Sequence, residues 1–291
     1  MKKPHRRLAA VAAALCAAPN LAASELETVL VTGTYVPRPA LTASTTVLDQ
    51  ARIEALNKRN LAGLLQTVPG LLVEEQGGPG GLTAVSVRGG EANFTLVLLD
   101  GVQVNDPTNS RGGSFDFASL NSALIERVEV VRGPRSAVYG SDALAGVINI
   151  VTREPAEAFS HSLVVEAGED DFLNTGLSLQ GRSGDLGYTL ELNHRDDGDP
   201  TPGSVRETDS ANLRLGWDVA PGHRLSAGFR YIDGDRSTYP EQSGGPELAT
   251  SDDLDQTDYQ DTVYSAGWTW DISTRWRSRV SGSRFDHEET F

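Results

Sequence analysis

The feature that most constrains the fold is a series of short segments, all in the second half of the chain, in which apolar and polar residues alternate. A period of two residues is typical of a β-strand with one apolar and one polar face. Tight turns such as 183–185 alternate with longer acidic connections at 196–209 and 234–259. Short turns on one side and long loops on the other are typical of a membrane β-barrel. The seven segments predicted as strands are 160–168, 174–182, 186–195, 210–218, 224–233, 260–271 and 274–287.

Two architectures fit this alternation, a β-barrel in a membrane and a soluble β-sandwich. No stretch after the first residues approaches 18 consecutive apolar residues, so a spanning helix is not expected there. A closed barrel is the other structure that satisfies every backbone hydrogen bond within a bilayer. Aromatic residues near the strand ends favour the barrel, because such residues gather at membrane interfaces, although each would also fit a soluble core. They are Tyr188, Trp217, Tyr231, Tyr264, Trp268, Trp270 and Trp276.

The first 23 residues resemble a secretory signal peptide. Basic residues between Lys2 and Arg7 precede an apolar run at 8–18, and small residues follow as far as Ala23. The apolar run is about half of the roughly 20 residues that a spanning helix requires, so cleavage is expected rather than anchoring. Cys16 lies inside this leader, without the small residue expected before a lipidated cysteine. The mature protein is therefore expected to contain neither a disulfide nor a thiolate metal site.

The charge balance is strongly acidic, with 25 Lys and Arg residues, four of them in the leader, against 40 Asp and Glu residues. Nucleic acid is a poor partner for such a surface, because phosphate binding depends on basic patches. Acidic clusters in the long connections suggest instead a calcium site, since Ca²⁺ takes six to eight oxygen ligands. No EF-hand pattern is present, so plain solvated loops remain the alternative. The candidate calcium ligands are Asp197, Asp199, Asp209, Asp233 and Asp235.

The five histidines are scattered, and none of them is expected to be a metal ligand. The sequence also lacks a Gly-x-Ser-x-Gly elbow, a phosphate-binding loop and a His-Glu-x-x-His helix. An enzyme is therefore not expected.

Residues 44–153 have the composition of one compact α+β unit. Asp49 and Asn60 are candidate caps of two short helices, the first with Ile53 and Leu56 on its apolar face. The apolar residues of the second helix are Leu61, Leu64 and Leu65, and the strands predicted to follow are 71–74, 83–88, 95–99, 128–131 and 146–152.

The segment at 24–43 has no helical periodicity and contains Pro37 and Pro39. Its Thr/Val-rich part at 27–33 has the alternation of a strand that could pair with the edge of another protein's sheet. An ordinary edge strand of this protein is the alternative reading of these residues.

The most specific motif is the run at 127–153, which contains a strand, the Gly-Pro-Arg-Ser-Ala-Val-Tyr-Gly-Ser-Asp-Ala stretch and a second apolar strand. Further landmarks are Val-Pro-Gly-Leu at 68–71, Val-Ser-Val-Arg-Gly at 85–89 and Leu-Leu-Asp-Gly-Val at 98–102. In their order and spacing these motifs resemble the plug domain of TonB-dependent outer-membrane receptors, and most closely the cobalamin receptors of that family. The resemblance covers nearly all of the α+β unit.

This resemblance implies an α+β plug domain followed by antiparallel transmembrane β-barrel strands, a partial 22-stranded barrel of the size that outer-membrane transporters have. The implied organisation is a signal peptide at 1–23, a TonB box and linker at 24–43, the plug at 44–153 and about seven barrel strands at 154–291. Seven strands cannot close such a barrel, so the chain is expected to be the N-terminal part of a longer protein.

The resemblance also implies roles for individual residues. Plug arginines are expected to pair with carboxylates of the barrel wall, and two plug loops are expected to face the ligand. TonB would bind Thr28, Val29, Leu30, Val31 and Thr32, and the residues expected to contact substrate are Gly78, Gly80, Gly81, Leu82, Thr83, Asn105, Asp106, Arg111 and Ser114.

The expected function is active import of a scarce nutrient, cobalamin or another corrinoid, across the outer membrane of a Gram-negative bacterium. The implied partners are TonB, the small-molecule ligand and outer-membrane lipid. No cofactor is required, although Ca²⁺ could order the acidic loops. A siderophore or heme receptor of the same family is the nearest alternative, and a passive porin or adhesion barrel is an alternative from another class.

Overall fold

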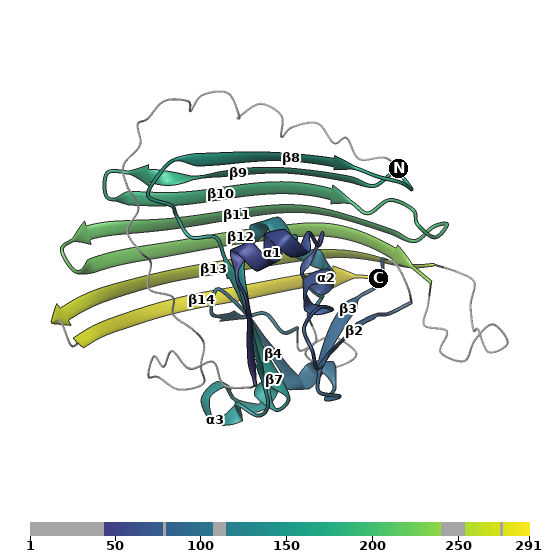
Figure 1. The fold of residues 1–291 in the computed structure, drawn as a ribbon, viewed down its shortest axis with the longest axis horizontal. Helices are drawn as coiled ribbons and strands as arrows, with labels where there is room; N and C mark the ends of the chain where they lie inside the picture. The colour runs from purple at the N-terminus through teal and green to yellow at the C-terminus, as the bar shows by residue number, and fades with distance from the viewer. Residues whose placement is uncertain (1–43, 78–79, 107–114, 240–253, 274–275) are drawn as a thin grey trace.

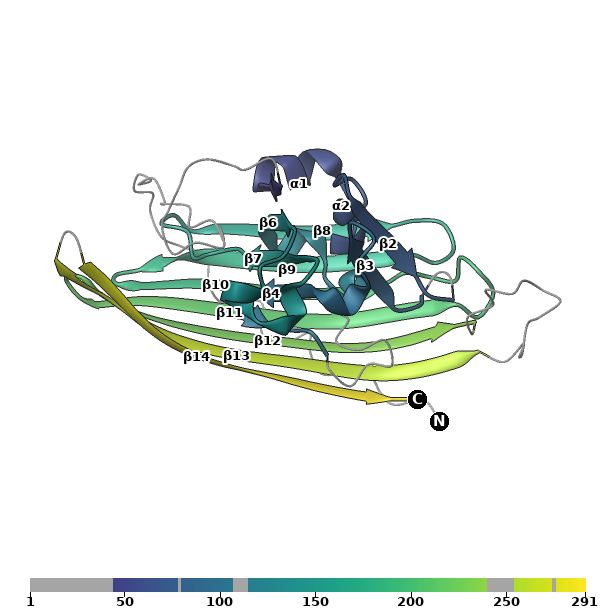
Figure 2. The ribbon, with the colours of Figure 1, turned by 90° about the horizontal axis from the view of Figure 1, so that it is seen from below.

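The chain folds into a curved wall of seven strands and a small α+β unit that lies against one face of this wall (Figures 1 and 2). This is a computed structural model, and it describes residues 44–77, 80–106, 115–239, 254–273 and 276–291. Among these residues, no helix is both long enough and apolar enough to cross a membrane.

The wall confirms the seven predicted strands, each antiparallel to its neighbours in the sequence. Their ends on the side of the long connections extend beyond the prediction; β11, for example, begins at Val205 rather than at residue 210. Backbone pairing continues there through polar residues such as Arg206 and Thr208, which the apolar alternation does not mark. The strands are β8 (Ser160–Ala167), β9 (Leu173–Ser183), β10 (Leu186–Asp196), β11 (Val205–Ala220), β12 (His223–Thr238), β13 (Asp255–Ser273) and β14 (Trp276–Thr290).

The two faces of the wall have opposite chemistry. Across β9–β13, one row of cross-strand partners on the face turned away from the α+β unit is apolar, and it ends in His161 on β8 and Arg284 on β14; its apolar members are Leu179, Leu190, Leu213, Phe229 and Tyr264. The inner face carries buried polar side chains, among them Thr189, Glu191, Asn212 and Arg230. A soluble sheet places its apolar face inward, so this arrangement is inverted. An apolar band on the outer face is typical of a lipid-facing barrel and favours it over the soluble sandwich.

Replacing Leu213 with arginine is expected to lower the free energy of unfolding by about 2–4 kcal/mol, because Leu213 lies mid-strand on the outer face, where a charge would enter the hydrocarbon. Leu225→Arg, near a tight turn and paired with Trp217, is the matched control and should cost about 0–1 kcal/mol. Urea titration of the full-length protein in lipid vesicles, followed by tryptophan fluorescence, measures both values. Equal losses would contradict a lipid-facing band.

The α+β unit contains a five-stranded sheet in the order β1-β6-β7-β4-β5 and a separate hairpin of β2 and β3. Only β4 and β7 run parallel to each other. The strands are β1 (Thr45–Leu48), β2 (Leu71–Glu75), β3 (Thr83–Val87), β4 (Thr95–Leu99), β5 (Val102–Gln103), β6 (Ile125–Arg132) and β7 (Gly146–Thr152), and the α-helices are α1 (Gln50–Leu56), α2 (Leu61–Leu65) and α3 (Ser136–Tyr139).

Both predicted helix caps are confirmed. The Asp49 carboxylate accepts a hydrogen bond from the Arg52 N–H at 2.8 Å, and the Asn60 amide oxygen accepts one from the Gly63 N–H at 2.9 Å. Each bond satisfies one N–H that the first helical turn leaves without a partner. The short helices therefore begin where the sequence predicts.

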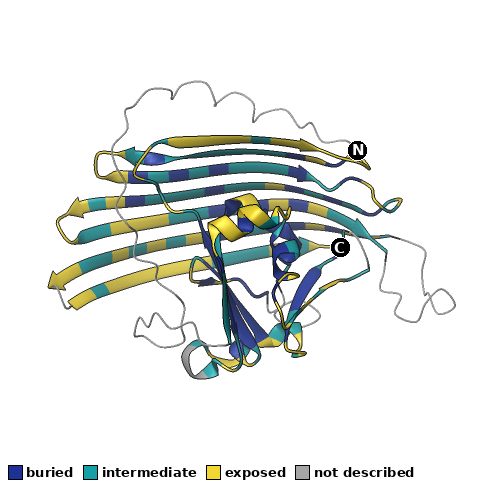
Figure 3. Cartoon of the chain, in the orientation of Figure 1, coloured by how far each residue is buried: buried dark blue, intermediate teal, exposed yellow. Residues whose placement is uncertain are grey.

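The hydrophobic core of the α+β unit continues into the wall. All residues of β4 and β7 are buried, and the cluster around them includes Ile232 on β12 together with Tyr259 and Val263 on β13. Figure 3 shows the buried residues gathered in the α+β unit and on the part of the wall that it covers. The two parts thus share apolar contacts, which hold the unit against the inner face.

Candidate functional site

The candidate site is the junction between two loops of the α+β unit and the inner face of β11–β14. One loop connects β2 with β3, and the other follows β5. They lie together, because the Thr83 N–H donates to the Asp116 carboxylate at 3.2 Å. Leu82 and Asp106, from different loops, also line one small pocket. The structure therefore brings together the two loops that the sequence predicts to face a ligand; Gly78, Arg111 and Ser114 lie outside the described residues.

Glycines allow the first loop to approach the wall closely. Gly77 and Gly80 have φ values of +73° and +88°. A Cβ atom would lie 2.1 Å from the Tyr239 carbonyl oxygen at Gly77 and 2.8 Å from the Ser237 carbonyl oxygen at Gly80. Both glycines are therefore required by backbone conformation and by space.

Asp116 is the centre of a buried ionic contact between the second loop and the wall. Its carboxylate lies 2.8 Å from the Arg206 guanidinium and 3.2 Å from that of Arg236. The side chains of Arg206, Arg236 and Asp116 are 2%, 9% and 12% exposed. Arg206 also donates to the carbonyl oxygens of Gly80 and Gly81, so a single guanidinium holds both loops.

The Glu75 carboxyl lies at the edge of the same junction and accepts a hydrogen bond from the Gly80 N–H at 3.2 Å. Desolvation next to the wall raises its pKa above the usual range, although much of the side chain is exposed, and the positive charge of Arg206 opposes this rise. The carboxyl therefore adds a titratable group beside the two loops.

Asn105 and Thr83, both predicted to contact substrate, are buried in the structure. The Asn105 amide binds the β4 backbone, accepting from the Val97 N–H at 2.7 Å and donating to the Thr95 carbonyl oxygen at 3.0 Å. Its side chain thus shapes the loop from within, and its contact with substrate stays a prediction.

A second set of contacts joins the α+β unit to the wall further along β11. The Arg214 guanidinium lies 3.0 Å from the Asp100 carboxylate and donates to the Thr152 carbonyl oxygen at 2.7 Å. The expectation that plug arginines pair with wall carboxylates is therefore wrong for these contacts, in which arginines of the wall pair with carboxylates of the α+β unit. Arg127 of the α+β unit instead pairs with Glu126 and Glu129 of the same unit.

The predicted calcium ligands are distributed over two regions of the wall. Asp209 and Asp233 face each other across β11 and β12. Asp235 stands opposite Glu207 on β11 and opposite Asp258 on β13. Asp197 and Asp199 lie in the β10–β11 connection, where Asp197 accepts from the Arg195 guanidinium at 2.6 Å. Among the described residues, these five aspartates do not form a group close enough to share one ion, so the calcium site stays a prediction.

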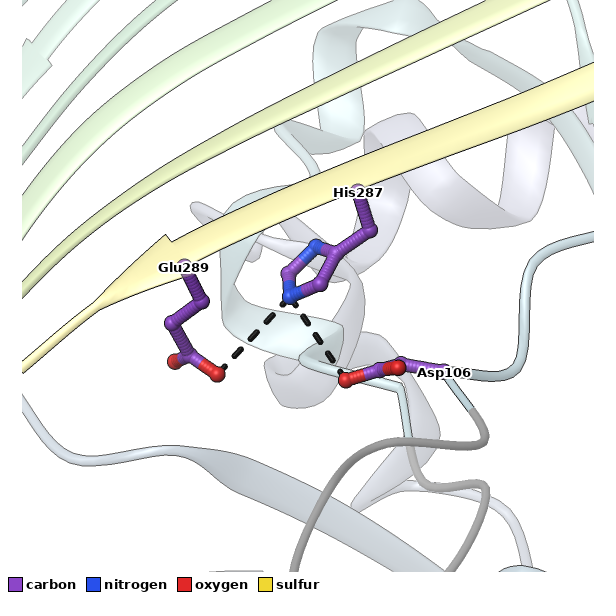
Figure 4. Close-up of side chains that lie close together, drawn as sticks. All are labelled: Asp106, His287 and Glu289. Atoms are coloured by element: carbon purple, nitrogen blue, oxygen red, sulfur yellow. Dashed lines mark ion pairs between the residues drawn. The ribbon is translucent and has the colours of Figure 1, made fainter.

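Asp106, His287 and Glu289 come together where the second loop meets β14 (Figure 4). The His287 Nε2 atom lies 3.5 Å from an Asp106 oxygen and 3.7 Å from a Glu289 oxygen. This cluster was not predicted from the sequence. Alternation along β14 would have placed His287 and Glu289 on the face of Phe285, but the pattern does not reveal that Asp106 faces them across 181 positions of sequence.

Two predicted features lie outside the described residues, namely the signal peptide at 1–23 and the TonB-binding residues Thr28–Thr32. The linker that follows them to residue 43 lies outside as well.

Comparison with known proteins identifies the α+β unit. A family model described as the TonB-dependent receptor plug domain matches residues 38–147. The vitamin B12 transporter BtuB of Vibrio vulnificus strain CMCP6 is 34% identical over 249 residues, which are 82% of this chain and 40% of the relative. The chain thus spans less than half the length of that relative.

Solved structures share the fold at low sequence identity. The alcaligin outer-membrane receptor FauA of Bordetella pertussis is 17% identical with a TM-score of 0.67, over 84% of this chain and 39% of that one. P. aeruginosa FpvA bound to heterologous pyoverdines is 19% identical with a TM-score of 0.69, over 82% and 33%. These similarities confirm the arrangement of the α+β unit on antiparallel strands. They do not identify a ligand.

Proposed function

We propose that this chain, which carries the plug domain of a TonB-dependent receptor and the antiparallel strands that follow it, belongs to an importer that takes up a scarce nutrient across the outer membrane. The observation that carries the proposal is the inverted wall, apolar outside and polar inside, with a folded plug held against its inner face by Arg206, Arg214 and Arg236. Such a plug would obstruct passive flow. A passive porin is therefore the weaker candidate.

The proposed ligand is cobalamin or a related corrinoid. Support comes from the motifs at 127–153 and from the relative named as a vitamin B12 transporter. A ferric siderophore is the second candidate, because the structural relatives include receptors whose names refer to siderophores. The two candidates differ in the ligand that the loops at 77–83 and 104–116 would contact.

The proposed mechanism starts at those two loops. A ligand that contacts them would displace Asp116, which is bonded to the wall through Arg206 and Arg236. Movement of the plug would then expose residues 28–32 to TonB, which would bind them by strand addition, a mode in which main-chain hydrogen bonds supply the affinity. Tension on this strand would shift the plug and open a path along the wall. Calcium held by the acidic strand ends would order the outer loops before the ligand binds.

Titration of the purified full-length protein with cyanocobalamin, with and without Ca²⁺, tests the proposal. We expect saturable binding that ferric siderophores and heme do not displace, and tighter binding with Ca²⁺. The double variant Asp233→Asn Asp235→Asn should lose the calcium effect, whereas Asp185→Asn in a tight turn should keep it. Binding of a ferric siderophore in place of cyanocobalamin would assign the second candidate. Ligand flux without a functioning TonB would contradict active import.

A further inference from the structure

The cluster of Asp106, His287 and Glu289 has the composition and spacing of a transition-metal site. One imidazole and two carboxylates meet there, and their ligating atoms all lie within 4.8 Å of one another. Figure 4 shows that Asp106 approaches from the plug loop, whereas His287 and Glu289 project from β14 toward it. Any ion bound there would join the plug to the wall.

The distances suit a small divalent ion. Two ligands at about 2.1 Å from a tetrahedral zinc ion lie roughly 3.4 Å apart. The imidazole Nε2 atom lies 3.5 Å and 3.7 Å from its two carboxylate partners, close to this separation, and the two carboxylates lie within 4.8 Å of each other, so they would move closer together to complete a coordination shell. Three protein ligands with a further position for water or another donor are common in zinc sites.

The surroundings of His287 also fit a metal ligand. Its Nδ1 atom lies 2.5 Å from the Asp261 carboxylate, a contact that directs Nε2 toward Asp106 and Glu289. Nε2 itself is buried and makes no hydrogen bond among the described residues. A carboxylate behind a ligating imidazole fixes the ring and makes it more basic. Arg236, bonded to the other Glu289 oxygen, holds that carboxylate in turn.

A protonated imidazole is the competing explanation, because a positive ring would also suit three neighbouring carboxylates. A metal ion and a proton compete for the same nitrogen, so only direct measurement separates the two. The mixed nitrogen and oxygen set favours Zn²⁺ and its neighbours over Ca²⁺ and Mg²⁺, which prefer oxygen alone.

We propose that Asp106, His287 and Glu289 bind a divalent transition-metal ion such as Zn²⁺, which fastens the second plug loop to β14. This inference goes beyond the proposed import function, and it holds for any ligand that the receptor carries. The site is separate from the predicted calcium ligands on the outer ends of the strands.

Calorimetric titration of the chelator-treated full-length protein with Zn²⁺ tests the proposal. We expect one ion per chain, with affinity reduced about 10–100-fold by Asp261→Asn, the usual effect of losing such a supporting carboxylate, and by more in Asp106→Asn and His287→Gln. Glu289→Gln should weaken binding too. Glu288→Gln is its matched control, because the next residue is exposed and carries the same charge change; it should bind as the unmodified protein does.

A second measurement needs no variant. Cu²⁺ bound to the unmodified protein should show nitrogen coupling from a single imidazole in pulsed electron paramagnetic resonance, and only a large excess of Zn²⁺ should remove this signal, because Cu²⁺ binds such a donor set more tightly than Zn²⁺. Absence of stoichiometric Zn²⁺ binding, or undiminished binding in both Asp106→Asn and His287→Gln, would overturn the proposal and assign the cluster as an ion-paired imidazolium.

Discussion

Replacing Asp116 with asparagine is expected to weaken the attachment of the plug to the wall by about 3–5 kcal/mol, the usual cost of removing one partner from a buried ion pair. Arg206 is 2% exposed, and its other hydrogen bonds are to the carbonyl oxygens of Gly80 and Gly81. Without the carboxylate its buried charge would have no carboxylate bonded to it, and only the electrostatic effect of Glu75 and Asp197 would remain. Arg236 retains Glu289 as a partner, so most of the loss arises at Arg206.

Asparagine has nearly the same shape as aspartate, so this substitution tests the effect of the charge alone. An asparagine oxygen can still accept from the Thr83 and Ala118 N–H groups that Asp116 now binds at 3.2 and 3.1 Å. Glu91→Gln, on an exposed residue of the same unit, is the matched control for the charge change. The double variant Asp116→Asn Arg206→Met should recover part of the stability, because it also removes the buried charge while the asparagine oxygen still accepts from both N–H groups.

Cysteine labelling measures this effect at the junction itself. A cysteine introduced at the buried Ala118, in a full-length background in which any other cysteine is replaced by serine, would report opening of this contact. Labelling rates in increasing urea give the free energy of opening. A rate in Asp116→Asn equal to that in Glu91→Gln would show that the buried ion pair does not hold the plug.

Local signals in the sequence predict most of the fold. Asp49 and Asn60 cap helices by bonds that reach only three residues, and strand alternation depends on side chains two positions apart. The strands β1 and β5 were missed, since four and two residues are too short to show a period. The predicted start of β11 is too late and the predicted end of β12 is too early, because backbone pairing continues beyond the apolar band of the wall.

The site could be predicted only in part, because its contacts join residues that are distant in the sequence. Family resemblance placed the two loops, and the structure brings them together through Thr83 and Asp116. Nothing local shows that Arg206 will face Asp116, 90 positions away, or that His287 will face Asp106. Alternation shows on which face of the wall a residue lies. Which wall residue contacts which plug residue depends on the position of the plug against the wall.

Replacing Leu30 with proline is expected to abolish uptake while ligand binding stays unchanged. If residues 28–32 add as a strand to TonB, main-chain hydrogen bonds supply the coupling, and proline both lacks the N–H donor and fixes φ. Alternate residues of a strand direct their N–H groups to the same neighbour, so Val31→Pro covers the other register. Radiolabelled ligand measures binding to cells and accumulation within them separately.

The informative control is Leu30→Ala, which keeps the backbone donor and removes the side chain. Strand addition predicts that Leu30→Ala transports far better than Leu30→Pro, whereas recognition of the leucine side chain would impair both alike. Val36→Pro, outside the pairing segment, tests whether any proline in the linker is harmful. Normal uptake in both Leu30→Pro and Val31→Pro would refute the pairing role, because no strand could then connect the plug to the energy source through these residues.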